Sequence, residues 1–121
     1  HLSRFIVFFV ALLALQHLFA AEAIKKSIEA IYKESAALNG KQVSIQGKVV
    51  KVNDGIMNRN FLHIQDGTGK EGSNDITITS DQTAKMGEKV TVTGTLILET
   101  DFGYGYKYPL LIEKSTIMLE K

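Results

Sequence analysis

The chain has 121 residues, 45% of them apolar, and contains no cysteine. This length and composition are those of a single globular domain. The 14 Lys and Arg residues are balanced by 13 Asp and Glu residues, so the chain lacks the positive charge that drives tight, non-specific nucleic-acid binding. The absence of cysteine excludes disulfides, thiolate metal sites, cysteine nucleophiles and haem attached through C-x-x-C-H.

The first segment, residues 1–23, has the order of a secretory signal. Arg4 precedes an apolar run over residues 5–15, and Ala21-Glu22-Ala23 fits an A-x-A cleavage pattern. The run is shorter than the ~20 apolar residues that span a bilayer comfortably. We therefore expect a cleaved signal and a periplasmic or secreted protein. The alternative is a retained hydrophobic helix, which would give the protein its contact with a membrane or with other copies.

Residues 24–39 predict an amphipathic helix. Its large apolar residues share one helical face: Ile24, Ile28, Ile31 and Leu38. Glu29 and Lys33 form a favourable i, i+4 pair, and Asn39-Gly40 provides a C-terminal stop. We expect the apolar face to cover one end of the domain, and a partner-binding helix is the alternative.

From residue 40 to residue 121 the pattern has the period of two that is typical of strands. The expected strands are 43–52, 60–65, 75–80, 89–100 and 110–119. The apolar alternation changes phase at Gly47, which indicates a strand that bends there and serves both halves of a small barrel. Residues 81–86 leave room for a short helical turn. Five strands with a helical connection after the third form the OB arrangement. We predict an all-β protein with an N-terminal helix, in which a five-stranded OB-fold barrel follows the signal or hydrophobic segment and the amphipathic helix.

The second predicted strand carries a family resemblance. Residues 60–69 read NFLHIQDGTG, which resembles the strand-two signature of OB-fold nucleic-acid-binding domains, including the anticodon-binding domains of aminoacyl-tRNA synthetases. The stretch from residue 40 to residue 117 is similar to small exported bacterial OB-fold proteins. The resemblance implies that Phe61 points outward and stacks on a base. The synthetase-like pattern usually has an arginine where this chain has Gln65, and its loss weakens the nucleic-acid interpretation.

OB-folds bind ligands between the loop that joins strands one and two and the loop that joins strands four and five. Near the first loop lie the guanidinium of Arg59 and the outward side chains of Phe61 and His63. In the second, residues 102–108, aromatic residues alternate with glycines, and a ring that stacks on a base contributes about 1–3 kcal/mol. The candidate ligand-binding residues are Arg59, Phe61, His63, Phe102, Tyr104, Tyr106, Lys107 and Tyr108. The alternative is that these aromatic residues pack across a hairpin on the outside of the barrel.

Enzyme and metal chemistry find little support in the sequence. His63 is the one histidine outside the expected signal, and a lone histidine does not make an ordinary metal site. The acidic turn over residues 66–75 lacks the spacing of an EF-hand, and no common nucleophile, metalloprotease or phosphate-loop motif occurs. We therefore predict no catalytic residues, metal or cofactor.

The expected function is that of an exported OB-fold binding module. Its ligand would be a single-stranded nucleic acid, an oligosaccharide or a small planar molecule. The alternative is a structural or assembly subunit, in which the N-terminal helices drive self-association, polymerisation or membrane anchoring.

Overall fold

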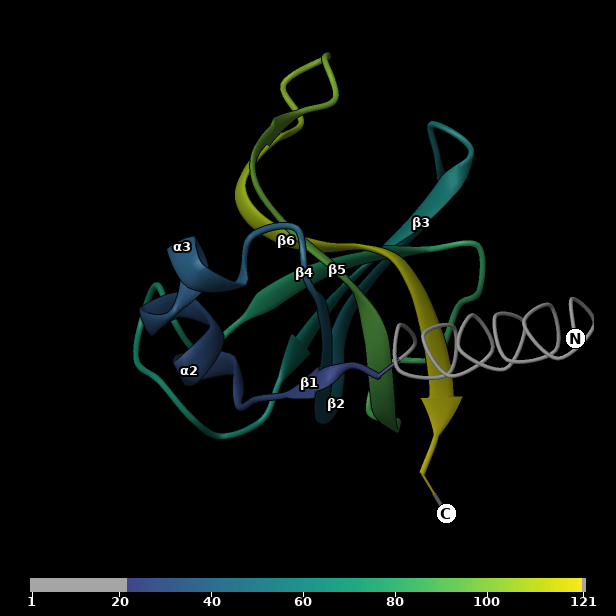
Figure 1. The fold of residues 1–121 in the computed structure, drawn as a ribbon. Coiled ribbons are helices and arrows are strands. Elements are labelled where there is room, and N and C mark those ends of the chain that lie inside the picture. The colour runs from purple at the N-terminus through teal and green to yellow at the C-terminus, as the bar shows by residue number, and fades with distance from the viewer. Residues whose placement is uncertain (1–21, 121) are drawn as a thin grey trace, which may run out of the picture.

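The computed structural model describes residues 22–120 (Figure 1), and the hydrophobic run expected as a signal lies outside them. The elements in chain order are β1 (Ile24–Lys25), α2 (Ile28–Lys33), α3 (Ser35–Leu38), β2 (Gln42–Ile56), β3 (Arg59–Gln65), β4 (Ile76–Ser80), β5 (Lys89–Asp101) and β6 (Lys107–Leu119). The prediction of a mainly β protein with a helical N-terminal part is confirmed. Among residues 22–120, no helix is long and apolar enough to cross a membrane.

The strands hydrogen-bond to one another in a ring. Their order is β1-β2-β3-β4-β6-β5, and β5 also pairs with β2. The β4–β6 pairing is parallel, and the other pairings within the ring are antiparallel. Ring closure gives β2, β3, β4, β5 and β6 a partner on each side, so none of these five is an edge strand.

Strand β2 takes part in two pairings. Residues 42–48 pair with β5, and residues 48–56 pair with β3. At the change of partner, a Cβ on Gly47 would lie 2.6 Å from the carbonyl oxygen of Gln65. Glycine is therefore required where the two pairings meet. The predicted service of one strand in two parts of the sheet is confirmed, and the register shift nearest to Gly47 lies between Val49 and Lys51.

The apolar core lies inside the ring, and α2 and α3 cover one end of it (Figure 1). The predicted helical face packs on this core, since Ile28, Ile31 and Leu38 are all buried. Ile24 departs from the prediction because it belongs to β1, which pairs with β2 in parallel. The helix starts later because Ser27 caps it by accepting a hydrogen bond from the backbone N–H of Ala30.

The connection between β4 and β5 differs from the expected helical turn. Residues 81–86 form a bend and an irregular stretch with no helix. Side chains hold this connection in place instead, because Gln82 Oε1 accepts a hydrogen bond from the backbone N–H of Ile117 at 2.8 Å. Ser80 Oγ likewise accepts one from the N–H of Gln82 at 3.0 Å. Such side-chain bonds offer the backbone an alternative to a helical turn.

Candidate ligand-binding site

The β2–β3 hairpin determines where the first candidate residues lie. Its turn consists of Met57 and Asn58, whose φ angles are 52° and 64°, as a two-residue type I′ hairpin requires. Arg59 therefore opens β3 and pairs with Ile56. Leu62 and Ile64 point into the core, as predicted, so the alternation of the strand puts the three candidates of β3 on its outer face.

Phe61 lies on that outer face, yet its side chain is only 1% exposed. The β5–β6 hairpin folds over it, and we call the four rings involved the aromatic cluster: Phe61, Phe102, Tyr106 and Tyr108. Ring centroids lie 5.5 Å from Phe61 for Phe102, edge to face, and 5.6 Å for Tyr108, nearly parallel. Tyr106 is 6.0 Å away. These are the separations of favourable aromatic pairs.

The burial of Phe61 corrects what the resemblance implies for this residue. A ring covered by the β5–β6 hairpin cannot present its face to a base. The geometry matches the alternative expectation, in which the aromatic residues pack across a hairpin on the outside of the sheet. Phe102, Tyr106 and Tyr108 remain partly exposed. Burial, followed by the electrostatic effect of Tyr106, raises the pKa of Tyr108.

The tip of the β5–β6 hairpin lies outside the aromatic cluster. Tyr104 is 94% exposed and has a φ of 55°, between Gly103 at 84° and Gly105 at 85°. The glycines adopt such angles freely, whereas a tyrosine there costs about 1–2 kcal/mol. Lys107, the first residue of β6, is also exposed.

Arg59 joins the aromatic cluster to a second feature. Its guanidinium carbon lies 4.8 Å from the centre of the Phe102 ring, which is a cation–π geometry. Its Nη1 lies 3.2 Å from Oε1 of Glu113 on β6. Arg59 is thus held between an aromatic face and a carboxylate.

His63 belongs to a different group of polar contacts. Its Nδ1 lies 2.8 Å from Oδ1 of Asp75, and Gln65 Nε2 donates to the other oxygen of Asp75 at 3.3 Å. The hydroxyl of Tyr32 donates to the backbone oxygen of Asp75, and burial, with the Asp75 charge second, raises the pKa of Tyr32. His63 therefore links β3 to the start of β4 rather than to the aromatic cluster. Within residues 22–120, no group of three or more His, Cys, Asp or Glu side chains could hold a metal ion.

A cavity lies beside Arg59, and it was not predicted from the sequence. We call it the polar pocket: it has a volume of about 470 Å³, and its walls include Arg59, Thr79, Ser80, Gln82, Glu113 and Ser115. Pockets of about 300–1,000 Å³ are the usual size of small-molecule sites. The pocket lies between the end of β4, the start of the following connection and the middle of β6.

A β-bulge in β6 lies at this pocket, whose lining includes residues 113–116. Strands β4 and β6 pair at residues 77–78 and 111–112, and beyond that point β6 carries an extra residue opposite Gly94 of β5. Two hydrogen bonds span the separation: the Lys114 N–H donates to Thr79 Oγ1, and Ser80 Oγ donates to the Ser115 carbonyl. The available sequence signals were the mid-strand Gly94 and the Thr79-Ser80 pair, but neither reveals which residues lie opposite.

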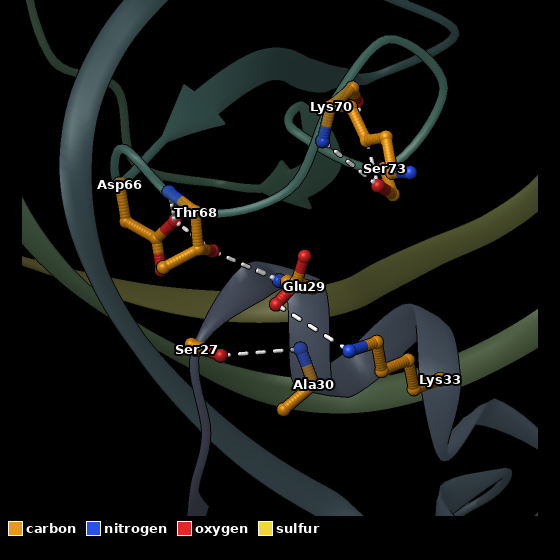
Figure 2. Close-up of polar contacts among 8 residues, drawn as sticks. All are labelled: Ser27, Glu29, Ala30, Lys33, Asp66, Thr68, Lys70 and Ser73. Atoms are coloured by element: carbon orange, nitrogen blue, oxygen red, sulfur yellow. Dashed lines mark hydrogen bonds and ion pairs between the residues drawn. The ribbon is translucent and has the colours of Figure 1, made fainter.

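The acidic turn after β3 has a structural role. Asp66 Oδ2 accepts a hydrogen bond from the N–H of Ile28 at 2.8 Å, and Thr68 Oγ1 accepts one from the N–H of Glu29 at 3.0 Å. Figure 2 shows Thr68 reaching the first turn of α2 beside the Ser27 cap. Burial alone would raise the pKa of Asp66, but hydrogen bonds from Thr68 and from backbone N–H groups outweigh it, and the pKa is lowered. The Asp-Gly-Thr sequence therefore caps a helix in this protein.

Fold and site together define a mainly β protein whose strands close a hydrogen-bonded ring, with an aromatic cluster and a polar pocket adjoining at Arg59. No family model matches the sequence, and no curated protein matches it. Among solved structures, the chain is similar to an OBody bound to hen egg-white lysozyme, with a TM-score of 0.51 and 16% sequence identity. The match covers 69% of this chain and 84% of the OBody chain. At this identity the similarity concerns the fold.

Proposed function

We propose that the chain is an OB-fold binding module, with a five-stranded barrel formed by β2 to β6. The cyclic strand order β2-β3-β4-β6-β5 supports this assignment, as does the similarity to an OBody, which is an OB-like engineered scaffold. In OB-folds, the ligand face spans the second and third barrel strands and the loops at their edges. Here that face is the outer side of β3 and β4.

The observation that carries the proposal is the meeting of two features on that face. The polar pocket offers hydrogen-bonding groups, and the aromatic cluster offers partly exposed rings, with Arg59 contacting both. Binding sites typically combine an apolar wall with a few convergent polar groups. Because Phe61 is covered, we assign ligand contact to Arg59, Phe102 and Tyr106 and treat Phe61 as their support. Tyr104, Tyr108 and Lys107 complete the rim.

The competing proposal, an assembly subunit, has less support from α2 and α3 than the sequence suggested. The seam of α2 and α3 packs on the core of the same chain, so that face has no apolar surface left for a partner. The hydrophobic run over residues 5–15 lies outside the described residues, and anchoring or polymerisation through it stays a separate proposal.

We include export in the same proposal because charged, apolar and small residues follow one another in positions 1–23 as they do in a secretory signal. The intact mass of the protein recovered from its host tests it. We expect a mature N-terminus at Ala21 or Ile24. A mass that retains residues 5–15 would instead favour anchoring or assembly.

Binding is tested with the ¹⁵N-labelled full chain, titrated with a single-stranded oligonucleotide and with neutral oligosaccharides. We expect saturable chemical-shift changes at Arg59, Phe102 and Thr79. Replacing Arg59 with alanine should weaken binding about tenfold, the effect of losing one charge-assisted hydrogen bond. Lys33→Ala, on the exposed side of α2, is the matched control. The proposal fails if no ligand class gives saturable changes or if they cluster away from this face.

A further inference from the structure

The polar pocket has no net charge. Among its lining residues, two cations, Arg59 and Lys114, face two carboxylates, Asp81 and Glu113. Arg59 is already paired with Glu113 at 3.2 Å. A phosphate-bearing ligand gains most of its affinity from cations that lose their counterions on binding, and here the two cations are offset by two carboxylates. The charge distribution therefore favours an uncharged ligand.

The hydrogen-bonding groups of the pocket are dense and planar. The pocket is lined by the guanidinium of Arg59, the carboxylate of Glu113 and the amides of Gln82 and Asn58. Hydroxyl groups of β4 and β6 lie next to them. Each planar group has two or more donor or acceptor positions in a fixed geometry. Such groups can bond to two adjacent hydroxyls at once, which is an arrangement that a sugar ring presents along its edge.

No aromatic residue lines the pocket itself, but the aromatic cluster adjoins it through Arg59. The Arg59 guanidinium lies over the Phe102 ring, 4.8 Å from its centre, and the residues Phe102 and Tyr106 are both partly exposed. The negatively polarised face of an aromatic ring attracts the weakly positive C–H groups of an apolar surface. A sugar ring has both a hydroxyl-bearing edge and a C–H face, so it matches the pocket and its aromatic wall together.

The pocket walls are held rigidly, which reduces the cost of ordering them around a ligand. Thr79 and Ser80 are each 2% exposed, and their hydroxyls bond to the backbone of β6 at Lys114 and Ser115. Lys114 itself has a φ of 53°. A non-glycine residue keeps such an angle when the surrounding contacts determine it.

We propose that the polar pocket binds a neutral sugar unit of an oligosaccharide, through Arg59 and Glu113 on its hydroxyl edge and Phe102 on its C–H face. This inference rests on the proposed binding function and names its ligand class.

The experiment uses the full chain and three neutral probes, cellotetraose, maltotetraose and chitotetraose, with a single-stranded oligothymidylate as the comparison ligand. Calorimetry and ¹⁵N chemical shifts report affinity and position. We expect at least one sugar to bind with a Kd below about 1 mM, with shifts at Arg59, Thr79 and Ser115. The oligothymidylate should bind more weakly than that sugar.

Two shape-conserving variants test the assigned residues. Arg59→Lys keeps the charge but removes the planar fork, so sugar affinity should fall about tenfold. Glu113→Gln removes the carboxylate and frees the guanidinium charge, so sugar affinity should fall similarly while affinity for oligothymidylate rises. Glu71→Gln, in the exposed turn after β3, is the matched control and should change neither. Circular dichroism melts verify that each variant is folded.

The outcomes separate the two proposals. If oligothymidylate binds the face more tightly than every sugar, the sugar inference is overturned and the binding function stands. If neither class binds, both proposals fail. Sugar binding that is unchanged in folded Arg59→Lys and Glu113→Gln would place the sugar elsewhere and overturn the assignment of this pocket.

Discussion

At the scale of single residues, Phe61 shows how a side chain on the outside of a sheet can become fully buried. Its direct neighbours across the strands are Asn53 and Thr79, which cannot cover a phenyl ring. The cover comes from Phe102, Tyr106 and Tyr108 of the β5–β6 hairpin. The ring therefore attaches the hairpin to the sheet and sets the position of the aromatic wall beside the polar pocket.

We predict that Phe61→Ala destabilises the protein by about 3 kcal/mol. That is the low end of the range for a buried phenylalanine, because the hairpin that covers it can partly collapse into the space. Urea unfolding followed by circular dichroism measures the change. Tyr104→Ala, at the fully exposed tip of the same hairpin, should shift stability by no more than about 0.5 kcal/mol. Equal losses in the two variants would show that the cluster contributes nothing.

At the scale of elements, α2 depends on a turn that lies far from it in sequence. A helix of six residues cannot satisfy many of its own N–H groups. Ser27, the N-cap residue, accepts a hydrogen bond from one of them, and Asp66 and Thr68 accept from two more out of the turn after β3. The turn thereby fixes the helix over one end of the ring, and with it the apolar face that closes the core.

Removing this cap should weaken the whole domain. We predict that Asp66→Ala lowers the free energy of unfolding by about 1–2 kcal/mol, as for other lost helix N-caps. The loss should come with reduced hydrogen-exchange protection at Ile28 and Glu29. Glu71→Ala, further along the same connection and exposed, is the control. A variant as stable as the parent would mean that the cap is dispensable.

The same carboxylate makes part of the stability depend on pH. The pKa of Asp66 is lower in the folded protein than its ordinary value of 3.8. Its contribution is therefore complete above that value and is lost as the pH falls through the folded pKa. We predict that, between about pH 5 and about pH 3, the parent loses more stability than Asp66→Asn, which has no charge to lose. Urea midpoints at both pH values measure this, and parallel losses would contradict it.

The strands could be predicted from the sequence because their signal is local. The alternation of Leu62 and Ile64 with outward residues is visible within one strand, and the phase change at Gly47 lies next to the point where β2 changes partner. The burial of Phe61 and the absence of a helical turn at residues 81–86 could not be predicted in this way. Both depend on contacts made between segments that are distant in the chain. The polar pocket could not be predicted for the same reason, because the sequence does not reveal that Gly94 faces the bulge of β6.

At the scale of the whole molecule, two glycines allow the ring to close. Gly47 lies where β2 passes from one partner to the other, and Gly94 lies where β5 faces the bulge of β6. A Cβ on Gly94 would lie 2.7 Å from the carbonyl oxygen of Glu113 and 2.8 Å from Cγ2 of Ile112. Closure of the sheet and the shape of the polar pocket thus depend on the same backbone contact.

We predict that Gly94→Ala costs about 1–3 kcal/mol, the usual range for forcing an extra methyl group into a packed site. The bulge must move, so ligand affinity at the polar pocket should fall in parallel. Thr95→Ala on the same strand removes a methyl and a hydroxyl without a clash, and should cost about 1 kcal/mol or less. If Gly94→Ala matched that control in both stability and affinity, the close contact would have no energetic consequence.

The ring and the β5–β6 hairpin should also differ in how they open. The ring amides of Ile45 and Val92 lie in strands that are paired with each other and flank the core, so their exchange requires global unfolding. Beyond the sheet, the hairpin turn is closed by bonds such as Tyr106 N–H to the Gly103 carbonyl at 2.9 Å. We predict by native-state hydrogen exchange that Phe102 and Tyr106 open with a much smaller free energy than Ile45 and Val92. A bound sugar should slow amide exchange at the hairpin directly. The ring amides should slow only as far as ligand binding raises the free energy of global unfolding. Equal protection of hairpin and ring in the free protein would contradict this prediction, because it would mean that the hairpin opens no more readily than the paired strands.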